Sequence, residues 1–160
     1  MNLAGKDLKE YIDVLKIPIA VSIALYIVGA VISIVNGVMG VALGPLGACV
    51  GVFTGLGFFV ISIVLGIALA VYVGQQMAKK KAANLMQCAA AGAVFGLIVG
   101  IIGGLANVFG AVVNIATSIG TFGINVVIAL LALFVGPVLS IIIGAACAAL
   151  GGHLAGAKGK

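Results

Sequence analysis

The chain has 160 residues, of which 64% are hydrophobic and 7% are charged, with eight basic and three acidic side chains. Soluble domains carry about a quarter charged residues, so this composition excludes a water-soluble globular fold, a disordered chain and a secreted disulfide scaffold. The basic residues are all lysines, which are typical of the flanks of membrane spans, and the net charge of +5 does not indicate a nucleic-acid partner. We therefore expect an all-α integral membrane protein surrounded by membrane lipids.

Residues 1–16 form the first predicted element and contain every acidic residue of the chain. Their apolar residues recur at helical spacing, while lysines and acidic residues occupy the opposite face. This pattern predicts a short amphipathic helix at the level of the lipid headgroups, ahead of the first membrane span. The apolar face consists of Leu8, Tyr11, Ile12 and Leu15.

Four long apolar stretches follow, and each exceeds the roughly 20 residues that a helix needs to cross a hydrocarbon core of about 30 Å. Glycine-containing connections are expected at about Gly37 to Gly47 and at about Gly110 to Gly123, so the four spans form two helical hairpins. The predicted organisation is a first hairpin at residues 17–78, a lysine-rich loop at 79–84, a second hairpin at 85–153 and a basic tail at 154–160.

The lysines alternate along the chain in a way that predicts orientation. They occur before the first span, between the two hairpins and after the last span, and neither connection within a hairpin contains one. Because an excess of lysine marks cytoplasmic loops, both termini and the central loop are expected to face the cytoplasm. The lysines expected at the membrane surface, in contact with lipid headgroups, are Lys79, Lys80, Lys81, Lys158 and Lys160.

The two hairpins resemble each other in sequence. One shift of register aligns Gly66 with Gly144 and Gly74 with Gly152, and a shift shorter by seven residues aligns the ends of the first and third spans. The matches predict an internal duplication. Since two spans separate each residue from its counterpart, the two hairpins are expected to have the same orientation in the membrane.

In outline, such glycine-rich duplicated hairpins resemble rotor-ring proteolipids. That resemblance would imply an ion-binding carboxylate within a span. No charged residue occurs in residues 17–78 or 82–157, so the resemblance ends at composition and topology.

Small residues recur at every fourth position in the second, third and fourth spans, and we call each such row a ladder. Ladders of this kind let helix backbones approach closely in lipid, where joining apolar surfaces gives little hydrophobic gain. Four helices offer more ladders than one bundle needs, so some are expected to face other subunits of a homo-oligomer; the alternative is that all of them are internal. The residues expected to pack or oligomerise are Gly66, Gly74, Gly92, Gly96, Gly100, Gly104, Gly136, Gly144 and Gly152.

Pro137 follows Gly136 within the fourth span and is expected to bend it, because proline removes one backbone hydrogen bond. Two interpretations stay open for this bend. It improves packing, or it is a gating hinge.

Residues that carry chemistry are scarce. The three cysteines lie far apart, His153 is the one histidine, and no span offers paired carboxylates, a nucleophile with a base, or a metal-ligand cluster. The sequence therefore predicts no catalytic residues, no metal site, no cofactor and no enzymatic activity.

Two functions fit this pattern. The first is a structural membrane or envelope component, or an accessory subunit of a larger membrane complex, that self-associates through its ladders. The alternative is a small channel, a holin-like protein or a carrier for an uncharged solute or lipid, which requires a polar lining. The available hydroxyl groups are few and widely separated, which favours the first function. They belong to Ser22, Ser33, Thr54, Ser62 and Ser140.

Overall fold

The structure is a computed structural model, and it describes residues 2–117 and 122–158. Long α-helices dominate these residues, and four of them are long and apolar enough to cross a membrane. The expectation of an all-α chain with four membrane-length helices is therefore confirmed. In chain order the elements are β1 (Asn2–Leu3), β2 (Lys6–Asp7), α1 (Leu8–Leu43), α2 (Pro45–Lys81), α3 (Leu85–Thr117) and α4 (Phe122–Leu154).

The helices are longer than the spans expected from the sequence. α1 and α2 have 36 and 37 residues, and a single residue, Gly44, joins them. Gly44 has φ +57° and ψ −132°, a conformation that favours glycine, and Pro45 then occupies the first turn of α2, where proline is well tolerated. The connection expected at Gly37 to Gly47 is therefore mostly helical. Glycine does not break a helix in lipid, because the backbone amides have no water to bond with instead.

The second connection is also more helical than expected. α3 continues to Thr117 and α4 begins at Phe122, within the stretch from Gly110 to Gly123 that the sequence assigned to a connection. Residues 118–121 lie outside the described residues.

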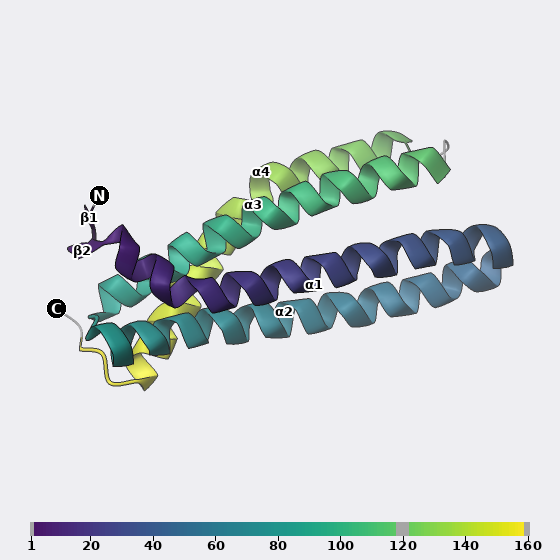
Figure 1. Cartoon of the computed structure of the whole chain (residues 1–160). Helices are drawn as coiled ribbons and strands as arrows, with labels where there is room; N and C mark the ends of the chain where they lie inside the picture. Colours follow the sequence, from purple (N-terminus) through teal and green to yellow (C-terminus); the bar gives the residue numbers. More distant parts are fainter. Residues whose placement is uncertain (1, 118–121, 159–160) are drawn as a thin grey trace.

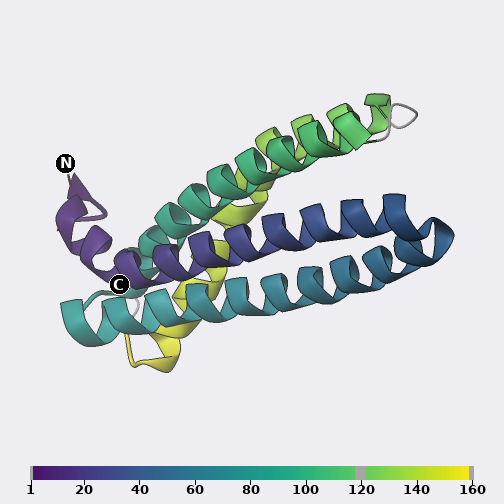
Figure 2. The same ribbon diagram turned by 45° about the vertical axis from the view of Figure 1, so that its right-hand side comes forward.

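The helices are arranged as two antiparallel pairs, α1 with α2 and α3 with α4, that meet at one end and separate toward the other (Figure 1). Both termini lie at the end where the pairs meet, as does the lysine-rich end of α2. We call this the basic end, and the opposite end, which carries Gly44, the distal end. Figure 2 shows that the last turns of α4 cross behind α1 and α2 at the basic end, and α4 contacts α2 there as well as α3.

The buried core lies at the basic end. Its members come from the start of α1, the end of α2 and the start of α3, with small residues of α4 packed against them. Toward the distal end the helices expose large apolar side chains, which suits a lipid environment. The core residues with the least exposure are Tyr11, Leu15, Val73, Met77, Cys88, Ala91 and Ala148.

The structure differs from the expectation of a separate amphipathic helix within residues 1–16. Residues 8–16 are the first turns of α1, and Tyr11 and Leu15 are buried against α2 and α3, whereas Ile12 is 48% exposed. Two side chains of the expected apolar face therefore cover the ends of neighbouring helices, and the side chain of Leu8 lies outside the described part of the chain. Pro18 is buried inside α1, and Figure 1 shows the first turns of α1 at an angle to the rest, as expected where proline cannot donate a backbone hydrogen bond.

Hydrogen bonds hold the N-terminal strands onto the basic end. The ammonium group of Lys6 donates to the carbonyl oxygen of Lys81 at 2.6 Å, and the side-chain amide of Gln87 donates to the carbonyl oxygen of Ala4 at 3.0 Å. Lys6 also pairs with Glu10, in the first turn of α1, at 3.3 Å. The first residues of the chain are therefore tied to both α2 and α3.

The turn between α2 and α3 is closed by local bonds. Ala82, whose φ is +46°, caps the C-terminus of α2, and its backbone N–H donates to the carbonyl oxygen of Met77. α3 then begins with a capping box, in which the backbone N–H of Gln87 donates to Asn84 Oδ1 at 2.9 Å and the backbone N–H of Asn84 donates to Gln87 Oε1 at 3.1 Å.

Candidate functional site

The ladder on α3 faces α4 along its whole length. A Cβ atom added at Gly92 would meet the carbonyl oxygen of Gly144, and one added at Gly96 would meet the carbonyl oxygen of Ser140. The two backbones are thus in direct contact. The same ladder continues along α3 at Gly100 and Gly104. A Cβ atom added at Gly100 would lie 2.6 Å from Pro137 Cα, and one added at Gly104 would lie 3.0 Å from Leu133 Cα.

Glycines also permit close contact between α2 and α4 at the basic end. A Cβ atom at Gly74 would meet the backbone of Ala148, and one at Gly151 would meet the backbone of Val71. A Cβ atom at Gly152 would lie 2.6 Å from the sulfur of Cys88, on α3. The sequence did not single out Gly151, because it lies outside the row that contains Gly152.

Two glycines of the predicted packing set are open. Among the described residues, a Cβ atom at Gly66 or at Gly136 would have no neighbour within 4 Å. Gly66 lies one turn from Ala70, which is buried, so the ladder of α2 is covered near the basic end and uncovered farther along. Gly136 is likewise one turn from Ser140, whose carbonyl oxygen lies against Gly96.

Pro137 lies inside α4, and its Cα atom packs against Gly100 of α3. The residue expected as a hinge therefore lies on the face where α3 and α4 are in closest contact.

Three of the five hydroxyl groups named from the sequence have hydrogen bonds to groups of α1 or α2. Ser22 donates to the carbonyl oxygen of Pro18 at 2.9 Å, and Ser62 donates to that of Phe58 at 2.8 Å, so both bond back to their own helices. Thr54 bonds to backbone oxygens of α2 and also donates to Asn36 Oδ1 of α1 at 3.0 Å.

The lysines expected at the membrane surface cluster at the basic end. Lys79, Lys80 and Lys81 form the last turn of α2, and Lys158 is exposed beyond α4. Lys160 lies outside the described residues. His153 is exposed in the last turn of α4.

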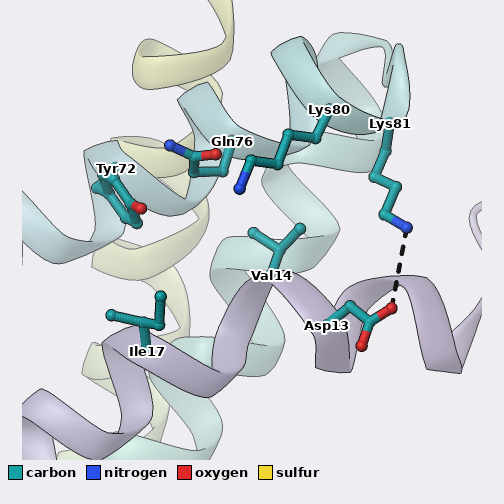
Figure 3. Close-up of a pocket in the computed structure, with 7 residues that line it drawn as sticks. All are labelled: Asp13, Val14, Ile17, Tyr72, Gln76, Lys80 and Lys81. Carbon is teal, nitrogen blue, oxygen red and sulfur yellow. Dashed lines mark ion pairs between the residues drawn. The ribbon is translucent and has the colours of Figure 1, made fainter.

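A pocket of about 280 Å³ opens between α1 and α2 at the basic end, and we call it the polar pocket (Figure 3). The ammonium group of Lys81 lies 4.0 Å from Asp13 Oδ2, and Asp13 Oδ1 accepts from Lys16 at 2.8 Å. Within the described part of the chain, the side chains of Tyr72, Gln76 and Lys80 have no hydrogen bond or ion pair. The residues that line the pocket are Asp13, Val14 and Ile17 of α1 and Tyr72, Gln76, Lys80 and Lys81 of α2.

Sequence reasoning missed the polar pocket, although a signal for it exists. Tyr72, Gln76 and Lys80 recur at every fourth position at the end of an otherwise apolar helix, which places three polar side chains on one face. The partner face on α1 follows only from the packing of Tyr11 and Leu15, which turns Asp13 toward α2.

In residues 2–117 and 122–158, no three His, Cys, Asp or Glu side chains come close enough together to bind a metal ion. Comparison with known proteins gives no match either: no protein family, curated protein or solved structure resembles the chain closely enough to be assigned. The ladders and the polar pocket are therefore the features of the chain that bear on its function.

Proposed function

We propose that this protein is a non-enzymatic structural component of a membrane that associates with further copies of itself through the uncovered parts of its ladders. The observation that carries the proposal is the division of the α2 ladder. Gly74 packs against α4 within the chain, whereas a Cβ atom at Gly66, two turns away, would meet no atom of the described residues within 4 Å.

The physical reason is the nature of helix association in lipid. Apolar side chains gain little from leaving lipid for another apolar surface, so association depends on dispersion contacts between closely approaching backbones. The small residues Gly66 and Gly136 permit such an approach, whereas large exposed side chains such as those of Leu65 and Ile67 keep a neighbouring backbone farther away. A second copy is the proposed occupant, because helices of this chain already pack on the same ladders within one subunit.

The proposal includes the topology expected from the lysines. Both termini and the lysine-rich end of α2 lie at the same end of the bundle, which supports an arrangement with that end in the cytoplasm. It also includes the tandem duplication of the two hairpins. The pairing of α1 with α2 and of α3 with α4 supports that origin.

The test is the native mass of the protein after gentle extraction from its own membrane. Wild-type protein is expected as a discrete multiple of the 15.7 kDa chain, or as an assembly with other subunits. Gly66→Leu and Gly136→Leu should reduce that mass. Gly57→Leu is the matched control, because Gly57 is also open but lies on the opposite face of α2, about two and a half turns from Gly66.

A monomeric wild-type protein, or equal effects of Gly57→Leu and Gly66→Leu, would contradict the proposal. Flux of an uncharged solute through a small ring of subunits would instead favour the channel or carrier function. A channel or carrier requires a polar lining. The hydroxyl groups of Ser22 and Ser62 are instead hydrogen-bonded to backbone oxygens of their own helices.

A further inference from the structure

We propose that the polar pocket binds the phosphate group of an anionic membrane phospholipid. The pocket brings polar donors of α2 opposite α1, at the end of a helix that is otherwise apolar (Figure 3). This proposal concerns one defined site, and it does not depend on the self-association proposed above.

The donors in the pocket match the needs of a phosphate group. The Lys80 side chain extends into the pocket in Figure 3, beside Gln76 and facing Val14, and its ammonium group has no partner among the described residues. The Gln76 amide and the Tyr72 hydroxyl are also without partners there. Charge-assisted hydrogen bonds to phosphate oxygens would satisfy these groups together.

The charges favour an anionic lipid over a zwitterionic one. Asp13 is the one acidic residue among those that line the pocket. It accepts a hydrogen bond at 2.8 Å from Lys16, which does not line the pocket. Its second oxygen lies 4.0 Å from the ammonium group of Lys81, at the limit of an ion pair. Lys80 and Lys81 therefore leave positive charge in the pocket, where the amine of a zwitterionic headgroup would be repelled.

The surroundings of the pocket favour a lipid over a soluble phosphate. Val14 and Ile17 form the apolar side of the pocket, and Ile17 is 64% exposed. The exposed surface of α1 continues with Val21 one turn farther from the basic end, so acyl chains attached to a bound phosphate would lie along apolar side chains. Basic pockets between membrane helices at the headgroup level bind anionic headgroups by this combination of contacts.

The test is a lipid titration of the full chain, purified without lipid in a neutral detergent and followed by native mass spectrometry. Phosphatidylglycerol is the probe, and phosphatidylcholine with the same acyl chains is the comparison. We expect the first phosphatidylglycerol to bind about fivefold or more tightly than phosphatidylcholine, because the pocket retains positive charge. Lys80→Gln should weaken phosphatidylglycerol binding about tenfold by removing one charge-assisted contact.

Lys79→Gln is the matched control, because the substitution removes the same charge from the same turn of α2. Lys79 itself does not line the pocket. We expect less than about a twofold change for it. Tyr72→Phe keeps the ring and removes only the hydroxyl group, so it should weaken binding without disturbing the fold. Circular dichroism and elution volume should match wild type for all three variants.

Equal losses for Lys79→Gln and Lys80→Gln would overturn the proposal in favour of general attraction to a basic surface. Equal binding of the two lipids would overturn it as well. Soluble glycerol phosphate at millimolar concentration should not displace the lipid, since it lacks acyl chains; displacement would assign the pocket to a soluble phosphate ligand and overturn the lipid assignment.

Discussion

Gly92 on α3 and Gly144 on α4 face each other so closely that the carbonyl oxygen of each occupies the place where a side chain of the other would begin. This mutual contact brings the two backbones together without intervening side chains. Glycine costs helix stability of about 1 kcal/mol relative to alanine in water, so its use here is explained by the contact it permits.

Because of this contact, an added methyl group should lower the stability of the fold at Gly92 but not at an open glycine of the same helix. Gly92→Ala should destabilise the fold by about 1–3 kcal/mol, since the methyl group would meet the Gly144 backbone. Gly110→Ala, at a position of α3 with no neighbour within 4 Å, should leave stability unchanged or raise it by up to about 1 kcal/mol. Maleimide labelling of the buried Cys88 during detergent-driven unfolding, with Cys49 and Cys147 changed to serine, measures both effects. Stabilisation by Gly92→Ala would show that the two backbones do not touch.

Asn36 and Asn107 align in the two hairpins but bond differently. Asn36 accepts from Thr54 across the first hairpin at 3.0 Å and donates to the Gly51 carbonyl oxygen at 3.4 Å, whereas Asn107 donates to Gly103 of its own helix at 2.9 Å. Asn36→Leu should therefore loosen the contact between α1 and α2 by about 0.6 kcal/mol, the average for a hydrogen bond between membrane helices, and by no more than about 1.7 kcal/mol. Asn107→Leu is the control, with no bond between helices to lose. Hydrogen exchange near Gly51 reports the difference, and equal exchange in the two variants would contradict it.

Tyr26 joins the two hairpins through contacts with α3. Its hydroxyl group donates to the carbonyl oxygen of Val99 on α3 at 3.1 Å, and its ring lies where a side chain at Gly103 would be. Tyr26→Phe should lower the free energy of unfolding by about 1 kcal/mol, because the bond is lost while the packing of the ring is kept. Tyr72→Phe should leave stability unchanged, as the Tyr72 hydroxyl has no partner in the described part of the chain. The same Cys88 labelling assay compares the two variants, and equal losses would argue against a link through Tyr26.

The orientation proposed from the lysines predicts which cysteine reacts from outside the cell. Cys49 is exposed near the distal end of α2, and about 45 Å of helix separates it from Lys79, more than the roughly 30 Å of a hydrocarbon core. A membrane-impermeant maleimide should therefore label Cys49 in intact cells. Lys158→Cys, in a chain with the other cysteines changed to serine, should be labelled only after permeabilisation. The reverse pattern would place the basic end outside.

The helical class and the four membrane-length helices could be predicted from sequence. The bilayer determines both signals that were used, the apolar composition and the spacing of the lysines. The ends of the helices could not be predicted. Gly37, Gly40 and Gly110 lie inside helices, since glycine in lipid has no water to compete for its backbone hydrogen bonds. A rule derived from soluble proteins therefore made the expected connections too long.

The partners of the ladders could not be predicted from sequence either. Gly66 and Gly74 belong to the same row on α2, yet only Gly74 contacts α4, because the two hairpins separate between them. Spacing assigns a residue to a face, and the angle between helices decides which part of the face is covered. The polar pocket has the same origin, since burial of Tyr11 sets the position of Asp13 relative to α2.

The most direct test of self-association is disulfide formation between copies in the native membrane. Gly66→Cys, with Cys49, Cys88 and Cys147 changed to serine, should form a dimer across the proposed contact on mild oxidation. Val64→Cys in the same background should stay monomeric, because Val64 is 60% exposed and lies about half a turn away, on the far side of α2. Dimer formation at Gly66 alone is the predicted result; no dimer at Gly66, or equal dimer at both positions, would contradict the account.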